Sequence, residues 1–205
     1  MKHDKASLMS AIAGLSSVGT RKFKTAKALI ALSDEQPDKL YPYFNAFRNL
    51  LETKNKIIQW SAFQIVANLA KVDKERRIDG IIVNYLAPIA GPVMVTAANS
   101  IMGSAKIAQT HKHLSNRIVR AILQVENAKY QTDECRNVAI GHAITALGLM
   151  EVKRSADAVG FLERQTANTR ASTRKKAELL LKEIRKEPSD TTLQGTASPL
   201  RARRP

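Results

Sequence analysis

The sequence predicts an all-α protein in which about five helical hairpins stack side by side as an α-solenoid. Three observations predict it: an apolar pattern that recurs about every forty residues, helical spacing of the apolar residues inside each recurrence, and no β-branched alternation typical of strands. The pattern is centred on Ala26, Ala62, Ala98, Ala139 and Ala177, which stand 36, 36, 41 and 38 residues apart. Repeats of this length are typical of paired helices that hide their apolar faces against neighbouring pairs.

Helical spacing defines the second helix of each expected hairpin. Its apolar positions stand four residues before the central alanine and three, four and seven residues after it, which is one face of an α-helix. For the last four modules in turn, these positions hold Ile58, Ile65, Val66 and Leu69; Met94, Ile101, Met102 and Ala105; Cys135, His142, Ala143 and Ala146; and Thr173, Leu180, Leu181 and Ile184. The first module has Lys22 and Ser33 at two of these positions and fits less well, as capping units often do.

An apolar stretch before each of these helices predicts the first helix of the hairpin. In chain order the stretches are Leu8, Ile12 and Leu15; Leu40, Phe44, Phe47 and Leu51; Ile78, Ile81, Ile82 and Leu86; Leu114, Ile118, Ile122 and Val125; and Ala156, Val159, Phe161 and Leu162. Pro92 is expected at a first helical position, where its missing N–H costs nothing. Thr132 is expected to cap a helix whose first turn holds Asp133 and Glu134. Ten helices in five pairs are predicted.

Composition favours a soluble, cytoplasmic protein with one structured domain. The chain of 205 residues is 44% hydrophobic, yet it has no apolar run near the roughly 20 residues of a membrane span. The single cysteine, Cys135, excludes an intrachain disulfide and suits a reducing compartment. The start of the chain resembles a signal peptide superficially, but Asp4 and nearby serines favour a first solenoid helix. Residues 1–187 are expected to form the solenoid, and residues 188–205 a disordered basic tail.

The openings of two second helices resemble the HEAT-repeat family. Residues 133–139 and 172–177 each place an arginine, Arg136 or Arg174, three positions before the central alanine. Segments 40–44, 67–73 and 131–137 are also similar to a group of short prokaryotic HEAT proteins of uncharacterised function. The resemblance implies a solenoid over residues 5–187 and an arginine-based polar ladder between modules, but no reaction. The other modules have Phe23, Gln59 and Val95 at the position of the arginine.

The candidate catalytic and metal-binding residues favour a non-catalytic protein without cofactor or metal. Cys135 and His142 stand seven residues apart on one helix, about 10.5 Å along its axis, which is too far for a nucleophile and its base. Both occupy apolar columns, which predicts buried packing residues. His111 and His113 would diverge by about 200° on a helix, and no third ligand stands nearby. Glycine-rich phosphate loops and Ser-His-Asp signatures are absent.

Net charge indicates a second class of partner. The formal charge is +15 and the pI is about 10.1, which attracts polyanions such as nucleic acid. The positive charge gathers toward the two ends of the predicted solenoid. The candidate phosphate-binding residues are Arg21, Lys22, Lys24, Lys27, Arg170, Arg174, Lys175 and Lys176. The alternative is that these residues form ordinary solvated helix faces.

The second helices are expected to form the concave, functional wall of the solenoid. Positions two before and two after each alanine should line it, which gives as candidate partner-binding residues Trp60, Gln64, Thr96, Ser100, Asn137 and Lys175. Trp60 is either a contact residue for a partner or packs across to a neighbouring helix. The sequence thus predicts a scaffold that binds a protein or peptide along this wall, with nucleic-acid binding by the basic ends as the alternative.

Overall fold

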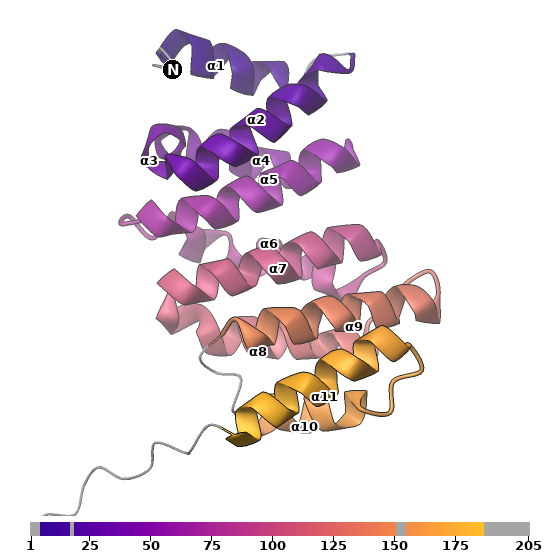
Figure 1. The fold of residues 1–205 in the computed structure, drawn as a ribbon. Helices are drawn as coiled ribbons and strands as arrows, with labels where there is room; N and C mark the ends of the chain where they lie inside the picture. Colours follow the sequence, from indigo (N-terminus) through magenta and orange to yellow (C-terminus); the bar gives the residue numbers. More distant parts are fainter. Residues whose placement is uncertain (1–4, 17–18, 151–154, 187–205) are drawn as a thin grey trace, which may run out of the picture.

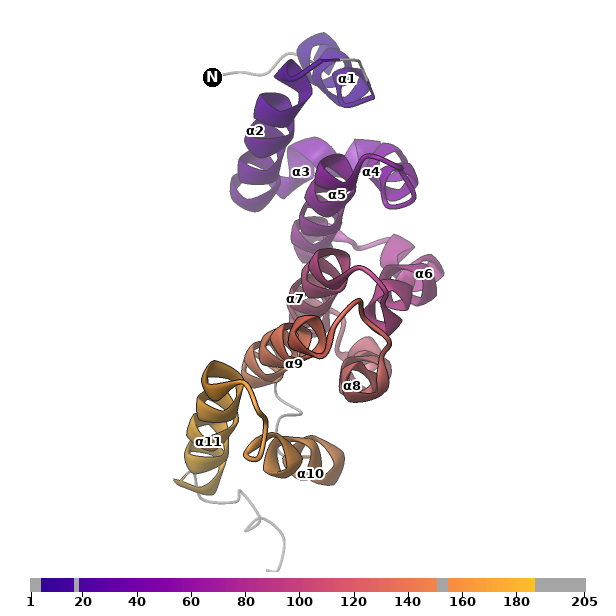
Figure 2. The same cartoon turned by 90° about the vertical axis from the view of Figure 1, so that its right-hand side faces the viewer.

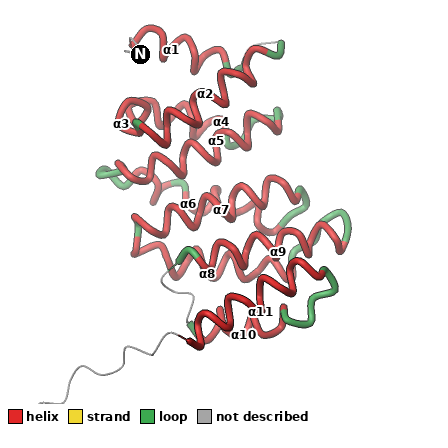
Figure 3. Tube along the Cα trace, viewed as in Figure 1, coloured by secondary structure: helices red, strands yellow, loops and turns green. Residues whose placement is uncertain are grey.

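All regular structure in the computed structural model is helical (Figure 3). The structure describes residues 5–16, 19–150 and 155–186, and this part contains eleven α-helices, six short 3-10 helices and no strand. The all-α prediction is confirmed. The expected tail at residues 188–205 lies outside the described residues. In the described part, no helix combines the length and the apolar character needed to cross a membrane.

The helices follow one another in five pairs. The first members are, in chain order, α1 (Lys5–Gly14); α3 (Pro37–Leu40), η1 (Tyr41–Tyr43) and α4 (Phe44–Leu50); η3 (Arg77–Gly80), α6 (Ile82–Leu86) and η4 (Ala87–Ala90); η5 (Lys112–Leu114), α8 (Ser115–Leu123) and η6 (Gln124–Asn127); and α10 (Ala156–Gln165). The second members are α2 (Arg21–Glu35), α5 (Lys56–Leu69) followed by η2 (Ala70–Val72), α7 (Met94–Thr110), α9 (Asp133–Gly148) and α11 (Ala171–Lys186).

The two sets of helices form two layers. The second members α2, α5, α7, α9 and α11 lie side by side in chain order (Figure 1), and the first members lie behind them (Figure 2). The main contacts within the layer of second members join α2 to α5, α5 to α7, α7 to α9 and α9 to α11. We call the open side of this layer the second-helix surface.

The first members differ from the prediction, because three of the five are broken into α-helical and 3-10 segments. Pro42 lies in η1 and Pro88 lies in η4, and a proline cannot donate the N–H that continues an α-helix. The second members are unbroken helices of 14 to 17 residues. The open side of the molecule is therefore built from its more regular elements.

Side-chain caps fix where several helices begin. Thr132 accepts a hydrogen bond from the backbone N–H of Cys135 at 3.1 Å, which confirms the cap predicted for α9. Asn55 caps α5 in the same way through the N–H of Ile58. The prediction for Pro92 is wrong, because α7 begins two residues later at Met94.

The central alanines lie in the core, as the repeat predicts. The exposed fraction is 8% for Ala98 and at most 1% for the other four. Ile65, Ile101 and Leu180, three residues after their alanines, are also buried. His142 occupies the same column but is only partly buried, so the column breaks at α9.

Candidate functional site: an apolar groove on the second-helix surface

A groove of about 430 Å³ opens on the second-helix surface over α7. We call it the α7 groove. Its walls come from α5, α7 and α9, and from the residue that follows α9. The lining residues are Gln64, Ala67, Met94, Val95, Ala98, Asn99, Met102, Gly103, Lys106, Val138, His142 and Leu149. Most of these side chains are apolar, and the groove has the volume of an ordinary ligand-binding cleft.

Small residues make the groove deep. Ala67, Ala98 and Gly103 lie among the lining residues, where larger side chains would fill the space. Gly103 is required by close packing, because a Cβ at this position would overlap the hydroxyl of Tyr85. Tyr85 is fully buried, and its O–H donates a hydrogen bond of 2.7 Å to the carbonyl of Phe63. The floor of the groove is thus fixed by a buried contact between α5, α6 and α7.

Large apolar side chains stand exposed along the groove. Val95 near the start of α7 is 38% exposed, and Leu149 after α9 is 48% exposed. Met102 lies between them in sequence and is partly buried. These side chains give the groove apolar walls, as in ordinary ligand-binding clefts.

Polar side chains on one side of the groove bond across adjacent helices. The amide of Gln64 on α5 donates a hydrogen bond of 3.1 Å to Asn99 on α7. The ammonium of Lys106 donates one of 2.8 Å to Asn68, whose own amide donates to Ser33 on α2 at 2.9 Å. These contacts hold α2, α5 and α7 in register.

The other side of the groove carries a histidine beside a lysine. Burial, and then the charge of Lys176, lower the pKa of His142 below its usual value of 6.5, so the imidazole is neutral at neutral pH. The ammonium of Lys176 on α11 reaches α9, where it donates to the carbonyl of Gly141 at 3.2 Å and to the hydroxyl of Thr145 at 3.0 Å. Among the described residues that line the groove there is one lysine and no carboxylate.

The six residues predicted to bind a partner do not share one surface in the structure. Gln64 lines the α7 groove. Trp60 packs across to the neighbouring helix, since its indole N–H donates to Thr96 at 3.0 Å. The prediction that Thr96 and Ser100 line the open surface is wrong: Thr96 is 5% exposed, and Ser100 is fully buried with its hydroxyl bonded to the carbonyl of Tyr85.

The remaining two predicted residues lie outside the groove. Asn137 on α9 is partly buried and donates to Thr169 at 3.0 Å, in the turn before α11. Lys175 is exposed on α11. Of the six candidates, the structure therefore brings only Gln64 to the groove.

A rotation of α7 by about one residue explains the difference at Thr96 and Ser100. The groove residues of α7 include Val95 and Asn99, each one residue before a predicted position. One residue turns a side chain by about 100° around the helix axis. The Gln64–Asn99 bond joins residues 35 apart, whereas the alanine column assumed 36. Ala97, which is fully buried, fits the centre of this helix better than Ala98.

The basic residues form two separate groups. Arg21, Lys22, Lys24 and Lys27 lie on α2, and the second group lies at or near the start of α11, at the opposite end of the layer (Figures 1 and 2). Arg170 in the second group forms an ion pair of 3.2 Å with Glu134. Arg174 donates to the carbonyl of Asn168, so this group is partly engaged within the protein.

The arginines of the HEAT resemblance do not join neighbouring modules through the contacts observed. Arg136 forms an ion pair of 2.7 Å with Asp133 of its own helix. Arg174 bonds to Asn168 in the turn of its own pair. The ladder implied for these two arginines is absent from their described contacts, and a different set of side chains joins the pairs.

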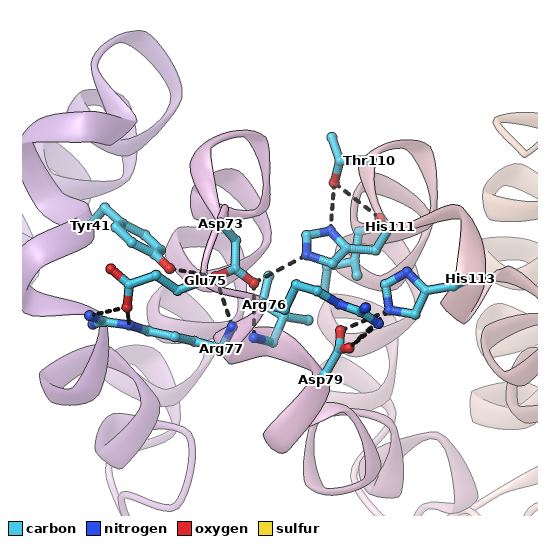
Figure 4. A network of polar contacts seen from close by, with 11 residues as sticks. Tyr41, Asp73, Glu75, Arg76, Arg77, Asp79, Thr110, His111 and His113 are labelled. Atoms are coloured by element: carbon cyan, nitrogen blue, oxygen red, sulfur yellow. Dashed lines mark hydrogen bonds and ion pairs between the residues drawn. The ribbon is translucent and has the colours of Figure 1, made fainter.

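That set is centred on Asp73 (Figure 4). The hydroxyl of Tyr41 donates to Oδ1 of Asp73 at 2.5 Å, and Nε2 of His111 lies 3.1 Å from Oδ2. The backbone N–H groups of Arg77 and Ile78 each donate to the same carboxylate at 2.9 Å. Tyr41 lies in η1 of the second pair, Asp73 in the connection that follows η2, and His111 in the connection between α7 and η5. We call this arrangement the Asp73 network.

Hydrogen bonds keep the buried Asp73 ionised. Burial alone would raise the pKa of this carboxyl, but the hydrogen bonds from Tyr41, from two backbone N–H groups and from His111 outweigh burial and lower the pKa. Burial, followed by the bond to Asp73, raises the pKa of Tyr41 to about 12. Asp73 is thus a carboxylate that joins η1 to the connections that follow η2 and α7.

Thr110 extends the network, because its hydroxyl contacts the imidazole of His111, which in turn contacts the carboxylate of Asp73. Its Oγ1 lies 2.9 Å from Nδ1 of His111, and it also approaches the carbonyl of Ile107 at 3.2 Å. Asp73 already accepts four hydrogen bonds with its side chain fully enclosed. We interpret this set as a structural tie between connections.

The two histidines here lie closer than the sequence predicts. The ring centroids of His111 and His113 are 5.8 Å apart, because His111 ends α7 and His113 lies in the 3-10 helix that follows. His111 faces Asp73, whereas His113 pairs with Asp79 at 2.9 Å. In the part of the chain that the structure describes, no group of three or more histidine, cysteine or acidic side chains could hold a metal ion.

Cys135 is less enclosed than its column predicts. It lies in the first turn of α9, is partly buried and bears a free thiol. Its backbone N–H belongs to the cap made by Thr132. Together with His142 in the groove, it shows that the apolar columns overestimate burial on α9.

A second, larger hollow of about 800 Å³ separates α4 from α6. Its lining mixes apolar residues such as Phe63 and Pro88 with charged residues such as Arg48, Glu52 and Lys56. Arg48 bonds to Asn49, and Lys56 bonds to Gln59, at 3.1 and 3.2 Å. The α7 groove is the more apolar of the two and lies on the regular face of the molecule.

No protein-family model matches the chain, and no curated protein matches it in sequence.

Proposed function

We propose that this chain is a HEAT-type α-solenoid that acts as a non-catalytic scaffold in the cytoplasm. It binds a protein or peptide partner along the second-helix surface. The observation that carries this function is the α7 groove, an apolar hollow of about 430 Å³ on a face built from three consecutive second helices. The repeated column of buried alanines and the order of contacts between second helices support the solenoid.

A partner that covers the exposed apolar side chains of the groove gains binding free energy from their burial. Fully burying a Val or Leu side chain is favourable by about 1.5–3 kcal/mol. Val95 and Leu149 are each exposed by more than a third, so a partner that covers both gains roughly 1 kcal/mol from each. Gly103 and the hydrogen bonds of Gln64 and Lys106 fix the shape of the groove before a partner arrives, which lowers the entropic cost of binding.

Substitution of one valine tests the proposal. Val95→Asp places a carboxylate on the wall of the groove, and Val83→Asp is the matched control, because Val83 on α6 is 65% exposed and does not line the groove. Peptides are first selected from a random displayed library for binding to the full chain. They are expected not to bind the Val95→Asp variant and still to bind the Val83→Asp variant. Equal binding to both variants, with both folded by circular dichroism, would contradict the proposed site.

The alternative function is binding of a nucleic-acid backbone by the basic ends. It is favoured by one observation: Arg21, Lys22 and Lys24 lie in the first four residues of α2, whose first turn has no acid. Cations at a helix N-terminus are disfavoured by the helix dipole, so fold stability does not explain their place. Affinity for duplex DNA that falls steeply with salt, and that is lost in Lys24→Glu/Lys175→Glu, would support this alternative.

A further inference from the structure

We infer that the segment bound in the α7 groove is acidic and amphipathic, with apolar side chains in the groove and carboxylates that meet Lys106 and Lys176. This inference rests on the proposed function and names the chemistry of the partner. It follows from where the charges stand around an apolar hollow.

The two lysines stand on opposite flanks of α7. The ammonium of Lys106 reaches toward α5, where it bonds to Asn68 at 2.8 Å. The ammonium of Lys176 bonds to Thr145 and to the carbonyl of Gly141 on α9. α5 and α9 contact α7 from its two sides (Figure 1). Lys106 therefore lines the groove on the side of α5, and Lys176 stands beyond its α9 wall, where its charge acts on the lining residue His142.

Both ammonium groups retain capacity for a carboxylate. A lysine ammonium has three donors; Lys106 gives one of them to an amide oxygen, and Lys176 gives two to a carbonyl and a hydroxyl. These partners are neutral, so they orient the lysines without cancelling their charge. Asp34, a carboxylate on whose pKa Lys106 acts weakly, is already paired with Lys71 at 2.8 Å.

The interior of the groove suits apolar side chains. His142 feels the charge of Lys176 and is neutral at neutral pH, and the remaining lining of the groove is mainly Val, Met, Ala and Leu. An apolar centre flanked by cations matches a segment with a row of apolar side chains bordered by Asp or Glu, as in helix-in-groove recognition. The net charge of +15 steers such a segment toward the protein.

The other occupants fit less well. A second copy of the chain would bring another +15 charges to a surface that is already positive. The chain's own residues 187–205 carry Arg201, Arg203 and Arg204 against two acids. A nucleic-acid backbone would meet the lysines but would leave Val95 and Leu149 without apolar contact.

Selection from a random displayed peptide library on the full chain tests the inference. The peptides enriched are expected to carry more Asp and Glu than Lys and Arg, together with at least two large apolar residues. For a labelled enriched peptide, Lys106→Glu/Lys176→Glu is expected to weaken binding by roughly tenfold. Lys39→Glu/Lys54→Glu changes the net charge equally at two exposed lysines outside the groove and is expected to weaken binding by less than about twofold.

The outcomes separate this inference from the proposed function. Enriched peptides that need Val95 but show no excess of acids, or that ignore charge reversal at Lys106 and Lys176, would overturn the inference and leave the groove as a binding site. If the selection enriches no peptide whose binding depends on Val95, both the inference and the proposed function are overturned. Self-association abolished by Val95→Asp, displacement of the peptide by duplex DNA, or displacement by a synthetic peptide of residues 187–205 would identify another occupant and overturn the inference.

Discussion

Nε2 of His111 lies 3.1 Å from Oδ2 of Asp73, although the two residues are 38 positions apart in the chain. The contact ties the connection after α7 to the connection after α5. The hydroxyl of Tyr41 reaches the same carboxylate from η1, in the first member of the second pair. One buried acid thus ties the second pair to the third, the two pairs that supply α5 and α7 to the groove.

Asp73→Asn is expected to lower the free energy of unfolding by about 2–4 kcal/mol. The amide keeps the size of the side chain but replaces an acceptor oxygen with a donor, which faces N–H or O–H groups that now lack a partner. Urea unfolding followed by circular dichroism measures the change. Asp79→Asn, which alters the partly exposed pair with His113, should cost less than about 1 kcal/mol. Equal effects would show that the Asp73 network does not hold the connections.

Alkaline pH is expected to destabilise the fold through its tyrosines. Burial raises the pKa of Tyr130 to about 12, the pKa of Tyr41 is likewise about 12, and burial raises that of Tyr85. Unfolded tyrosines ionise near pH 10. A raised pKa therefore gives stability that is complete below pH 10 and is lost as the pH rises through 12. In a pH titration, the absorbance of tyrosinate should rise at a higher pH in the folded protein than in the protein unfolded in urea, where it should rise near pH 10. Early ionisation of the folded protein would contradict the enclosure of these rings.

Mild acid is expected to destabilise the fold through His142. The folded pKa of this imidazole lies below its usual 6.5 because of burial and the charge of Lys176. As the pH falls, the unfolded chain therefore binds a proton at this imidazole before the folded chain does. The stability that this provides is present above pH 6.5 and is lost as the pH falls through the folded pKa. The pH dependence of urea unfolding between pH 7 and 5 should flatten in His142→Phe. An unchanged slope would show that His142 stays exposed to solvent.

Gly103→Ala is expected to destabilise the protein by about 1–3 kcal/mol, because the new methyl group overlaps the hydroxyl of Tyr85. Tyr85→Phe alone removes the hydroxyl that donates to the carbonyl of Phe63. The double variant should be less destabilised than the sum of the two, since removing the hydroxyl makes room for the methyl group. Gly80→Ala is the control, as a Cβ there meets no atom within 4 Å. Additive effects would contradict the close contact.

The sequence was sufficient to predict the helices, because the apolar period and the caps are local signals. The buried alanine column and the Thr132 cap were correct. The phase of α7 was not predictable from the apolar pattern, because the column centred on Ala98 is wholly apolar, whereas one centred on Ala97 holds Ser100 and Ser104. The structure nevertheless buries both serines, whose hydroxyls bond to backbone carbonyls. This phase exposes Val95, and so it decides which residues form the groove.

The Asp73 network was beyond sequence inspection for a different reason. Its members come from a 3-10 helix and from two connections, and these carry no period that would align Tyr41, Asp73 and His111. The neighbouring His111 and His113 were judged as residues of one helix, whereas α7 ends at Thr110 and the chain changes to a 3-10 helix.

The floor of the α7 groove belongs to a helix enclosed between α5 and α9, far from either end of the layer. Fraying begins at terminal elements, which have a neighbour on one side alone. Backbone amides of α7 should therefore exchange with deuterium more slowly than those of α1 or α11. Partial melting of the ends, under heat or proteolysis, would leave the α7 groove intact until the cooperative centre of the molecule opens.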